Sequence, residues 1–198
     1  SAVVAGLVAG NSLNGNAMSG SDLLDAAAGL EGHPDNVAAA LVGGCQIVVS
    51  EERGLRTSEV PLPSELRAVV YIPETPMPTS QARGLLESRV DRADAVFNIG
   101  RVALLVKALA TGELGAMAGA TEDRLHQPAR QTLFPAMKVI IRAAMDAGAL
   151  GAFLSGADSA IDAAVTFQAG SSTTVVTDCE LDLNGAIVYD GGSFDGDG

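Results

Sequence analysis

Residues 30–44 read LEGHPDNVAAALVGG, and most of the chemically versatile side chains of this stretch lie in its first seven residues. The segment Glu31–Asn36 has a carboxylate, an imidazole, a second carboxylate and an amide, separated by Gly32 and Pro34. These groups can offer oxygen ligands to Mg²⁺ and hydrogen bonds to an amino-acid or hydroxyl substrate. The residues that follow are small and uncharged, so the loop is expected to lie against a buried helix.

A structural interpretation of the same loop is also open. Asp35 and Asn36 can cap the following helix, Pro34 can fix a turn, and His33 can be an ordinary surface residue. The sequence of the loop by itself therefore leaves a binding site and a helix cap as alternatives.

The flanking sequence predicts helices before the loop and strands after it. The small apolar run Ser1–Asn11 predicts a buried helix, and a second helix is expected at Asp22–Leu30, capped by Ser19 or Ser21. A strand is expected at Cys45–Val49, and the charged residues 51–59 predict a turn or an exposed strand.

The second half of the chain predicts further helices and strands without strict alternation, which indicates the α+β class. The longest helical pattern is 92–111, with one apolar side made of Ala95, Val96, Ile99, Val102, Ala103 and Val106. Shorter helical segments are expected at 80–87, 123–130 and 136–147, and strands at 66–72, 148–155, 174–177 and 186–189.

The composition excludes several classes of partner. The chain has 198 residues, is 47% hydrophobic and carries a formal net charge of −12. Its twelve basic residues are scattered, so neither nucleic acid nor an anionic membrane surface is an expected partner. The longest apolar stretch, 102–110, is far shorter than the ~20 residues that span a bilayer.

Two cysteines, Cys45 and Cys179, stand in unrelated contexts with no second Cys or His at metal-ligand spacing. Each is expected to be a structural buried thiol, which fits a reducing compartment and a cytoplasmic location.

The stretch at residues 30–44 strongly resembles the signature of the homoserine kinases. They belong to the superfamily named after galactokinase, homoserine kinase, mevalonate kinase and phosphomevalonate kinase, the GHMP kinases. Segments that are also similar to this family follow in order along the chain, at 79–83 (TSQAR), 94–105, 127–135 and 183–188. The resemblance implies a two-lobed α+β kinase fold, with residues 1–62 completing an N-terminal domain and residues 63–198 forming the C-terminal domain.

The resemblance implies transfer of the γ-phosphoryl group of ATP to the hydroxyl of L-homoserine, in the presence of Mg²⁺. It assigns Glu31 to the metal, His33, Asp35 and Asn36 to the homoserine pocket, and Arg83 and Arg130 to the substrate carboxylate. A guanidinium suits that last role because its planar fork pairs both carboxylate oxygens. Asn36 cannot take a proton, so it is expected to orient the hydroxyl, with Asp35 as the alternative for a catalytic base. A homodimer is compatible with the family.

The chain departs from the family pattern in two places. The phosphate loop of the family, Gly-Leu-Gly-Ser-Ser-Ala, would precede Ser1, so this chain alone is expected to bind ATP poorly. Ser155, Gly156 and Ala157 match a loop near the phosphates, but Asp158 stands where the family has glycine. These departures favour one alternative, a non-catalytic amino-acid-binding member of the superfamily. A kinase for another small hydroxylated substrate is a second alternative, and the string at residues 31–36 argues against it.

Overall fold

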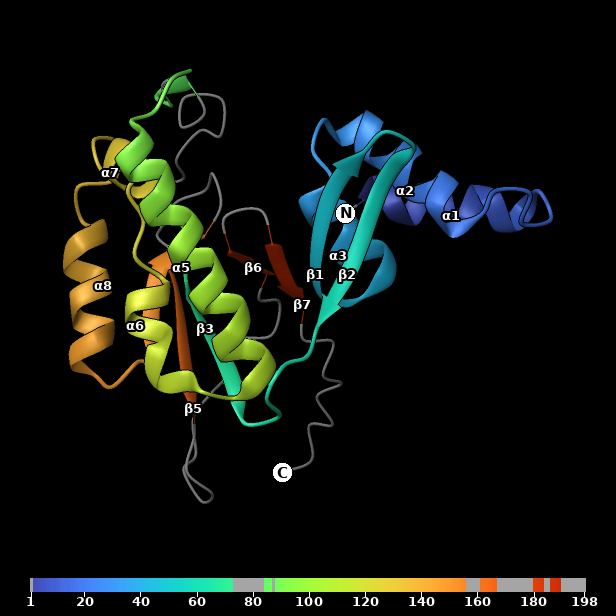
Figure 1. Cartoon of the computed structure of the whole chain (residues 1–198). Helices are drawn as coiled ribbons and strands as arrows, with labels where there is room; N and C mark the ends of the chain where they lie inside the picture. The colour runs from blue at the N-terminus through green and yellow to red at the C-terminus, as the bar shows by residue number, and fades with distance from the viewer. Residues whose placement is uncertain are drawn as a thin grey trace. The chain divides into compact units, whose positions relative to one another are not determined.

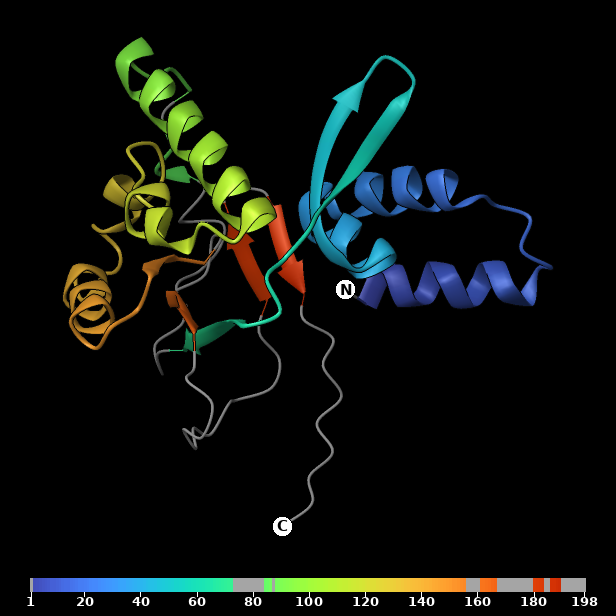
Figure 2. The same ribbon diagram turned by 60° about the horizontal axis from the view of Figure 1, so that its bottom comes forward.

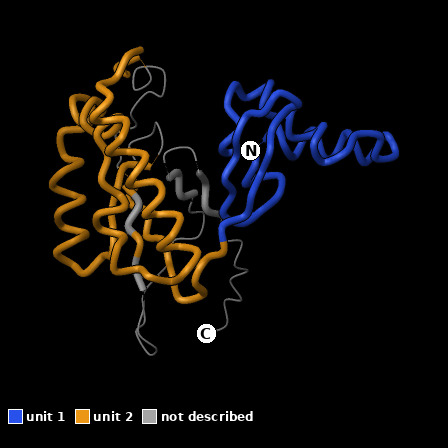
Figure 3. Tube along the Cα trace, in the orientation of Figure 1, with its two compact units in different colours: residues 1–60, 180–198 blue, residues 61–179 orange. Residues whose placement is uncertain are grey.

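The computed structural model describes residues 2–72, 84–86, 88–155, 161–166, 180–183 and 186–189 (Figure 1). The chain divides into two compact units, residues 1–60 with 180–198 and residues 61–179 (Figure 3). The predicted division into 1–62 and 63–198 differs from this one at its C-terminal end. The reason is that the last strand, β7 (Ala186–Tyr189), pairs with β1 (Gly44–Glu51) in the first unit.

Three helices open the first unit. Helices α1 (Ala2–Leu13) and α2 (Gly20–Glu31) form an antiparallel hairpin (Figure 2), and α3 (Asp35–Val42) follows. Ser19 caps α2 as predicted. Its hydroxyl accepts a hydrogen bond from the backbone N–H of Asp22 (3.2 Å), and the Asp22 carboxylate accepts one from the backbone N–H of Ser19 (2.9 Å). This reciprocal capping box fixes where the helix begins.

The sheet of the first unit has the strand order β2-β1-β7-β6, and every neighbouring pair is antiparallel. Strands β1 and β2 (Gly54–Val60) form a hairpin whose register runs from Cys45 opposite Val60 to Glu51 opposite Gly54. Strand β6 (Glu180–Leu183) pairs with β7. The predicted strands at 45–49 and 186–189 are confirmed, and the charged segment 51–59 forms a turn and most of β2.

The core of the first unit lies between its helices and the β1–β2 hairpin. It is built from Val4, Leu24, Ala27, Val37 and Ala38, with Val48 and Leu55 of the hairpin partly buried against them. Val4 is the one fully buried residue of α1. The expectation of a buried first helix is therefore wrong for the described residues, because this small-residue helix packs on one side only.

A hydrogen bond joins α2 to the hairpin. Asp25 Oδ1 accepts from the backbone N–H of Leu55 (3.1 Å). The preceding Gly54 has φ +110°, and a Cβ placed on it would lie 2.6 Å from Asp25 Oδ2. Glycine is required at position 54 both for this backbone conformation and for the close approach of the carboxylate.

The second unit is a three-stranded antiparallel sheet with helices packed against it. The strand order is β3-β5-β4, with β3 at Leu66–Tyr71, β4 at Gly151–Leu154 and β5 at Ile161–Thr166. Its helical elements are α5 (Arg92–Thr111), the 3₁₀ turn η1 (Leu114–Ala116), α6 (Met117–Ala120), α7 (Gln127–Arg130) and α8 (Met137–Asp146). Helix α8 buries Met137 against Leu154 and Ile161 of the sheet.

Helix α5 has the predicted bounds but not the predicted orientation. Val96 and Ile99, on the side that the apolar pattern favoured, are 62% and 68% exposed. The buried residues are instead Asn98, Leu105, Ala108 and Leu109. Apolar residues lie all around this helix, so periodicity alone could not select the packed side.

Two predicted elements fall largely outside the described residues, the helix at 80–87 (apart from residues 84–86) and the strand at 174–177. Among the helices that the structure describes, none is both long and apolar enough to cross a membrane.

Candidate active site

The loop at residues 31–36 is a tight connection between α2 and α3. Helix α2 ends because Gly32 adopts a left-handed conformation (φ 80°), and the Gly32 N–H bonds the carbonyl of Ala28 (2.9 Å). The next helix begins at once, since the carbonyl of Pro34 accepts from Ala38 N–H (2.9 Å). The four candidate side chains are thereby held on a few residues of fixed backbone.

His33 and Asp35 form a close pair in this loop. His33 Nδ1 lies 2.6 Å from Asp35 Oδ1, and both side chains are 25% exposed. The same Asp35 oxygen accepts from the backbone N–H of Asn36 (2.9 Å). If neutral His33 donates through Nδ1, its Nε2 is left as an acceptor for a ligand. Asp35 Oδ1 is thus engaged within the loop.

Asn36 has the atom of this loop that most clearly indicates a place for a ligand. Its Oδ1 is buried and has no hydrogen-bond partner among the described residues. A buried polar atom without a partner is uncommon, and it lowers the free energy of unfolding by roughly 1–3 kcal/mol unless a hydrogen-bond donor reaches it. Helix α3 has Pro34 at its N-cap and no side-chain cap bond there. The capping interpretation therefore does not account for Asn36, although Asp35 does hold one N–H at the start of the helix.

Glu31, the predicted metal ligand, is the last residue of α2 and is half-buried. The residues that the structure describes contain no group of three or more His, Cys, Asp or Glu side chains able to hold a metal. Mg²⁺ is commonly bound by one or two carboxylates together with phosphate oxygens and water. The C-terminal end of a helix also favours a cation. Glu31 therefore fits Mg²⁺ as a single protein ligand that shares the ion with a phosphate group.

The remaining predicted site residues belong to the second unit. Arg130 ends α7 and is 9% exposed, and Ser155 directly follows β4 and is 8% exposed. Arg83, Gly156 and Ala157 lie outside the described residues. The structure thus brings Glu31, His33, Asp35 and Asn36 together in one loop, and holds Arg130 and Ser155 on elements of the other unit.

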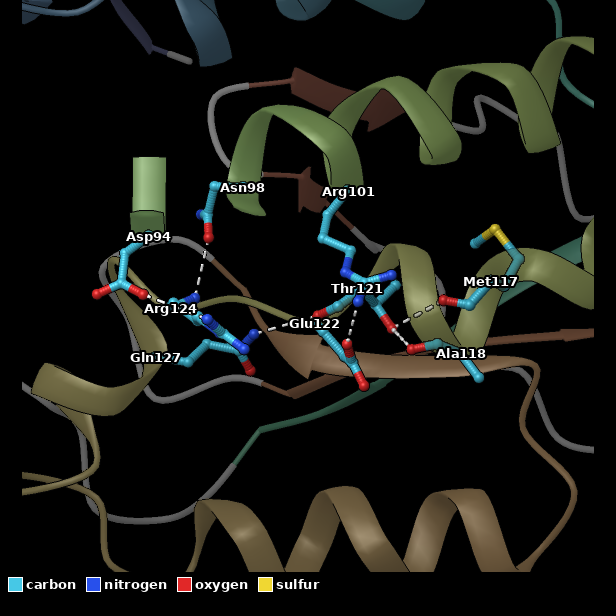
Figure 4. Close-up of polar contacts among 9 residues, drawn as sticks. All are labelled: Asp94, Asn98, Arg101, Met117, Ala118, Thr121, Glu122, Arg124 and Gln127. Carbon is cyan, nitrogen blue, oxygen red and sulfur yellow. Dashed lines mark hydrogen bonds and ion pairs between the residues drawn. The ribbon is translucent and has the colours of Figure 1, made fainter. Parts of the chain in front are cut away.

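The second unit also has a cavity of about 560 Å³ beside α7. In it the Phe97 ring lies under two guanidinium groups, those of Arg101 (4.3 Å) and Arg124 (3.8 Å). Each cation has a carboxylate partner, Glu122 (2.9 Å) for Arg101 and Asp94 (3.5 Å) for Arg124 (Figure 4). The lining includes neither Arg130 nor Ser155, so the cavity does not coincide with the predicted substrate residues.

A buried polar network beside this cavity was missed by the sequence analysis. Asn98 of α5 is 7% exposed and donates to Asp123 Oδ1 (2.6 Å). Burial alone would raise the pKa of Asp123. The hydrogen bonds from Asn98 and from the backbone of Gln127, Leu125 and His126 outweigh it and lower that pKa. An asparagine within the apolar run Ala95–Ile99, and an aspartate four residues before Gln127-Pro128, were the available signals.

Comparison with known proteins agrees with this architecture. The family model "GHMP kinases C terminal" matches residues 105–160. A homoserine kinase of Nostoc punctiforme is 38% identical over 93% of this chain and 66% of its own length, and one of Trichormus variabilis is 42% identical over 79% and 52%. The crystal structure of homoserine kinase from Cytophaga hutchinsonii has a TM-score of 0.73 and 34% identity, covering 83% of this chain and 54% of that one.

The chain therefore belongs to the GHMP kinases, and the predicted α+β fold of that type is confirmed. Within this class, the relatives at 38% and 42% identity are homoserine kinases. The chain spans between about half and two thirds of the length of these relatives.

Proposed function

We propose that the whole protein is a homoserine kinase, which transfers the γ-phosphoryl group of ATP to the hydroxyl of L-homoserine. The observation that carries this proposal is the 38–42% identity to homoserine kinases, which extends over 79–93% of the chain. The loop at residues 31–36 lies within the stretch that resembles the family signature.

The loop supplies the groups that orient the hydroxyl. The buried Asn36 Oδ1, which has no partner among the described residues, accepts a hydrogen bond from the substrate hydroxyl. His33, fixed by Asp35 at 2.6 Å, presents Nε2 on the same loop. Phosphoryl transfer depends on positioning and on charge neutralisation more than on covalent chemistry. A neutral amide can therefore align the hydroxyl, whose proton passes to an oxygen of the transferred phosphoryl group as ADP leaves. The alternative is that Asp35 acts as the base that takes this proton.

The second unit supplies cations and a phosphate loop. Arg130, together with Arg83, pairs the carboxylate of homoserine through its guanidinium fork. Ser155, Gly156 and Ala157 contact the phosphates of ATP. Glu31, at the end of α2 in the first unit, would hold Mg²⁺, and this ion would supply positive charge to the transferred phosphoryl group.

The setting of this reaction is the cytoplasm, with small molecules as ligands and a homodimer as the candidate assembly. A buried free thiol at Cys45 supports a reducing compartment. The net charge of −12 supports the absence of nucleic-acid partners.

An assay that couples ADP release to a visible signal tests the proposal on the whole protein. L-homoserine, mevalonate and galactose are compared with Mg²⁺-ATP, and we expect turnover with homoserine alone. Preferential turnover of mevalonate or galactose would contradict the substrate assignment. Homoserine binding by calorimetry without any ADP release would instead favour the non-catalytic amino-acid-binding alternative.

A further inference from the structure

Asp123 organises the turn that carries Arg130. Its Oδ1 accepts from Leu125 N–H (3.0 Å), and its Oδ2 accepts from His126 N–H (2.8 Å) and from Gln127 N–H. These donors lie at the start of α7, which is four residues long. A helix of one turn has no stability of its own, because its few internal bonds cannot offset the ordering of its backbone. The Asp123 carboxylate therefore holds the start of α7 in place.

Asn98 ties this carboxylate to the longest helix of the unit. Its Nδ2 donates to Asp123 Oδ1 (2.6 Å). Its Oδ1 accepts from the backbone N–H of Arg124 (3.0 Å), a bond that Figure 4 shows. One buried amide on the twenty-residue helix α5 thus fixes two consecutive residues of the segment that leads into α7. Both of its polar atoms are satisfied within the unit.

Gln127 connects the same turn to the sheet. Its Nε2 donates to the carbonyl of Thr121 (3.3 Å; Figure 4), and its Oε1 accepts from the backbone N–H of Leu154 (3.3 Å). Leu154 is the last residue of β4 and directly precedes Ser155. The turn that begins at Gln127 and ends at Arg130 is therefore bonded to the strand end that leads into the proposed phosphate loop.

We propose that Asn98 and Asp123 are positioning residues of the phosphoryl transfer, which set the placement of Arg130 relative to the Leu154–Ser155 end of β4. This inference rests on the proposed function, because it takes Arg130 as the partner of the homoserine carboxylate. The pair acts through the backbone of α7 and does not touch substrate.

The test uses four variants of the whole protein. Asn98→Asp places two carboxylates at the hydrogen-bond distance, and Asp123→Asn removes the charged acceptor. The double variant Asn98→Asp/Asp123→Asn restores a donor–acceptor pair between positions 98 and 123 with the roles exchanged, but its amide N–H₂ faces the Leu125 N–H that Asp123 Oδ1 accepts in the wild type. Asp94→Asn is the matched control, because Asp94 lies on the same helix as Asn98 and its side chain makes an exposed ion pair with Arg124. Such exposed pairs contribute little.

We expect Asn98→Asp to lower kcat/KM for homoserine roughly 10- to 100-fold, the scale of one lost charge-assisted hydrogen bond. The loss should lie in KM for homoserine. An amino alcohol that lacks the carboxylate should react at an unchanged rate, because it does not use Arg130. The double variant should recover at most part of the loss, because the Leu125 N–H stays without its acceptor, and the control should stay near the wild type.

Equal losses with homoserine and with the amino alcohol would overturn the positioning role. If Asn98→Asp fails to fold, Asn98→Ala takes its place, since it removes the amide without adding charge. This variant should also lose kcat/KM for homoserine and not for the amino alcohol, but by a smaller factor. A wild-type protein without homoserine turnover would overturn the proposed function and this inference together. If the wild type turns over homoserine normally and the variants lose activity equally with homoserine and with the amino alcohol, this inference alone would be overturned.

Discussion

His33 Nδ1 lies 2.6 Å from Asp35 Oδ1, and this oxygen also accepts the Asn36 N–H at 2.9 Å. One carboxylate oxygen therefore fixes the imidazole on one side and the start of α3 on the other. A carboxylate acceptor makes such bonds about twice as strong as neutral ones.

Replacing Asp35 by Asn should lower kcat/KM for homoserine about 10- to 150-fold, because a charge-assisted bond of ~1.5–3 kcal/mol to the imidazole is lost. Steady-state kinetics over a range of pH measures this. A loss confined to kcat and larger than ~100-fold would instead identify Asp35 as the base. Asp22→Asn, which weakens only the capping box of α2, is the control and should leave kcat and KM for homoserine unchanged.

Asn36→Leu should separate stability from activity. Leucine has the same branching at Cγ and removes an unsatisfied buried oxygen, so Tm should stay constant or rise while homoserine turnover falls at least tenfold. Differential scanning calorimetry and the coupled assay test the two effects. Asn11→Leu is the contrasting control. Asn11 makes two hydrogen bonds with Met18, so this change should lower Tm and spare turnover. A large drop in Tm for Asn36→Leu would show that Asn36 has a structural partner.

Glu31→Gln should impair turnover that depends on Mg²⁺ far more than folding. A neutral amide is a poor ligand for a hard divalent cation, so the Mg²⁺ concentration needed for half-maximal rate should rise severalfold. A Mg²⁺ titration at saturating ATP measures it, with Glu51→Gln in the exposed pair with Arg56 as control. An unchanged titration curve would remove Glu31 from the metal site.

Arg130→Lys should keep the charge and lose the two-pronged contact with the substrate carboxylate. We expect kcat/KM for homoserine to fall roughly 10- to 150-fold, with a much smaller change in KM for ATP. The preference for homoserine over an amino alcohol should disappear, and Arg83→Lys should behave likewise. Arg142→Lys, an exposed position on α8, is the control. Full discrimination in both variants would show that these arginines do not bind the carboxylate.

The thiol of Cys45 should be unreactive in the native protein. It is 2% exposed, and burial together with the nearby Glu59 raises its pKa from the ordinary 9.0 to about 11. At pH 8 the thiolate that reacts with iodoacetamide is therefore scarce and shielded. Mass mapping of the peptide that contains residue 45 should show labelling in urea and almost none in buffer. Rapid native labelling would contradict the burial.

Most elements and the site loop could be predicted from sequence because local signals decide them. Ser19 and Gly32 bound α2 through their own backbone preferences, and the loop that follows is contiguous in sequence. The packed side of α5 could not be predicted, since both sides are apolar and only tertiary contacts choose between them. The Asn98–Asp123 bond joins residues 25 positions apart, a pairing that no local pattern encodes.

The contact between Asp25 and Gly54 couples two distant positions as mutations accumulate. Any side chain at 54 would meet the Asp25 carboxylate at 2.6 Å, whereas a shorter residue at 25 would remove that obstacle and leave the Leu55 N–H without its acceptor. Neither position can therefore vary freely while the other is unchanged. In a deep mutational scan, the effect of a substitution at 54 should depend on the residue at 25, and the pair should appear as an epistatic unit linking the site-bearing helix to the hairpin.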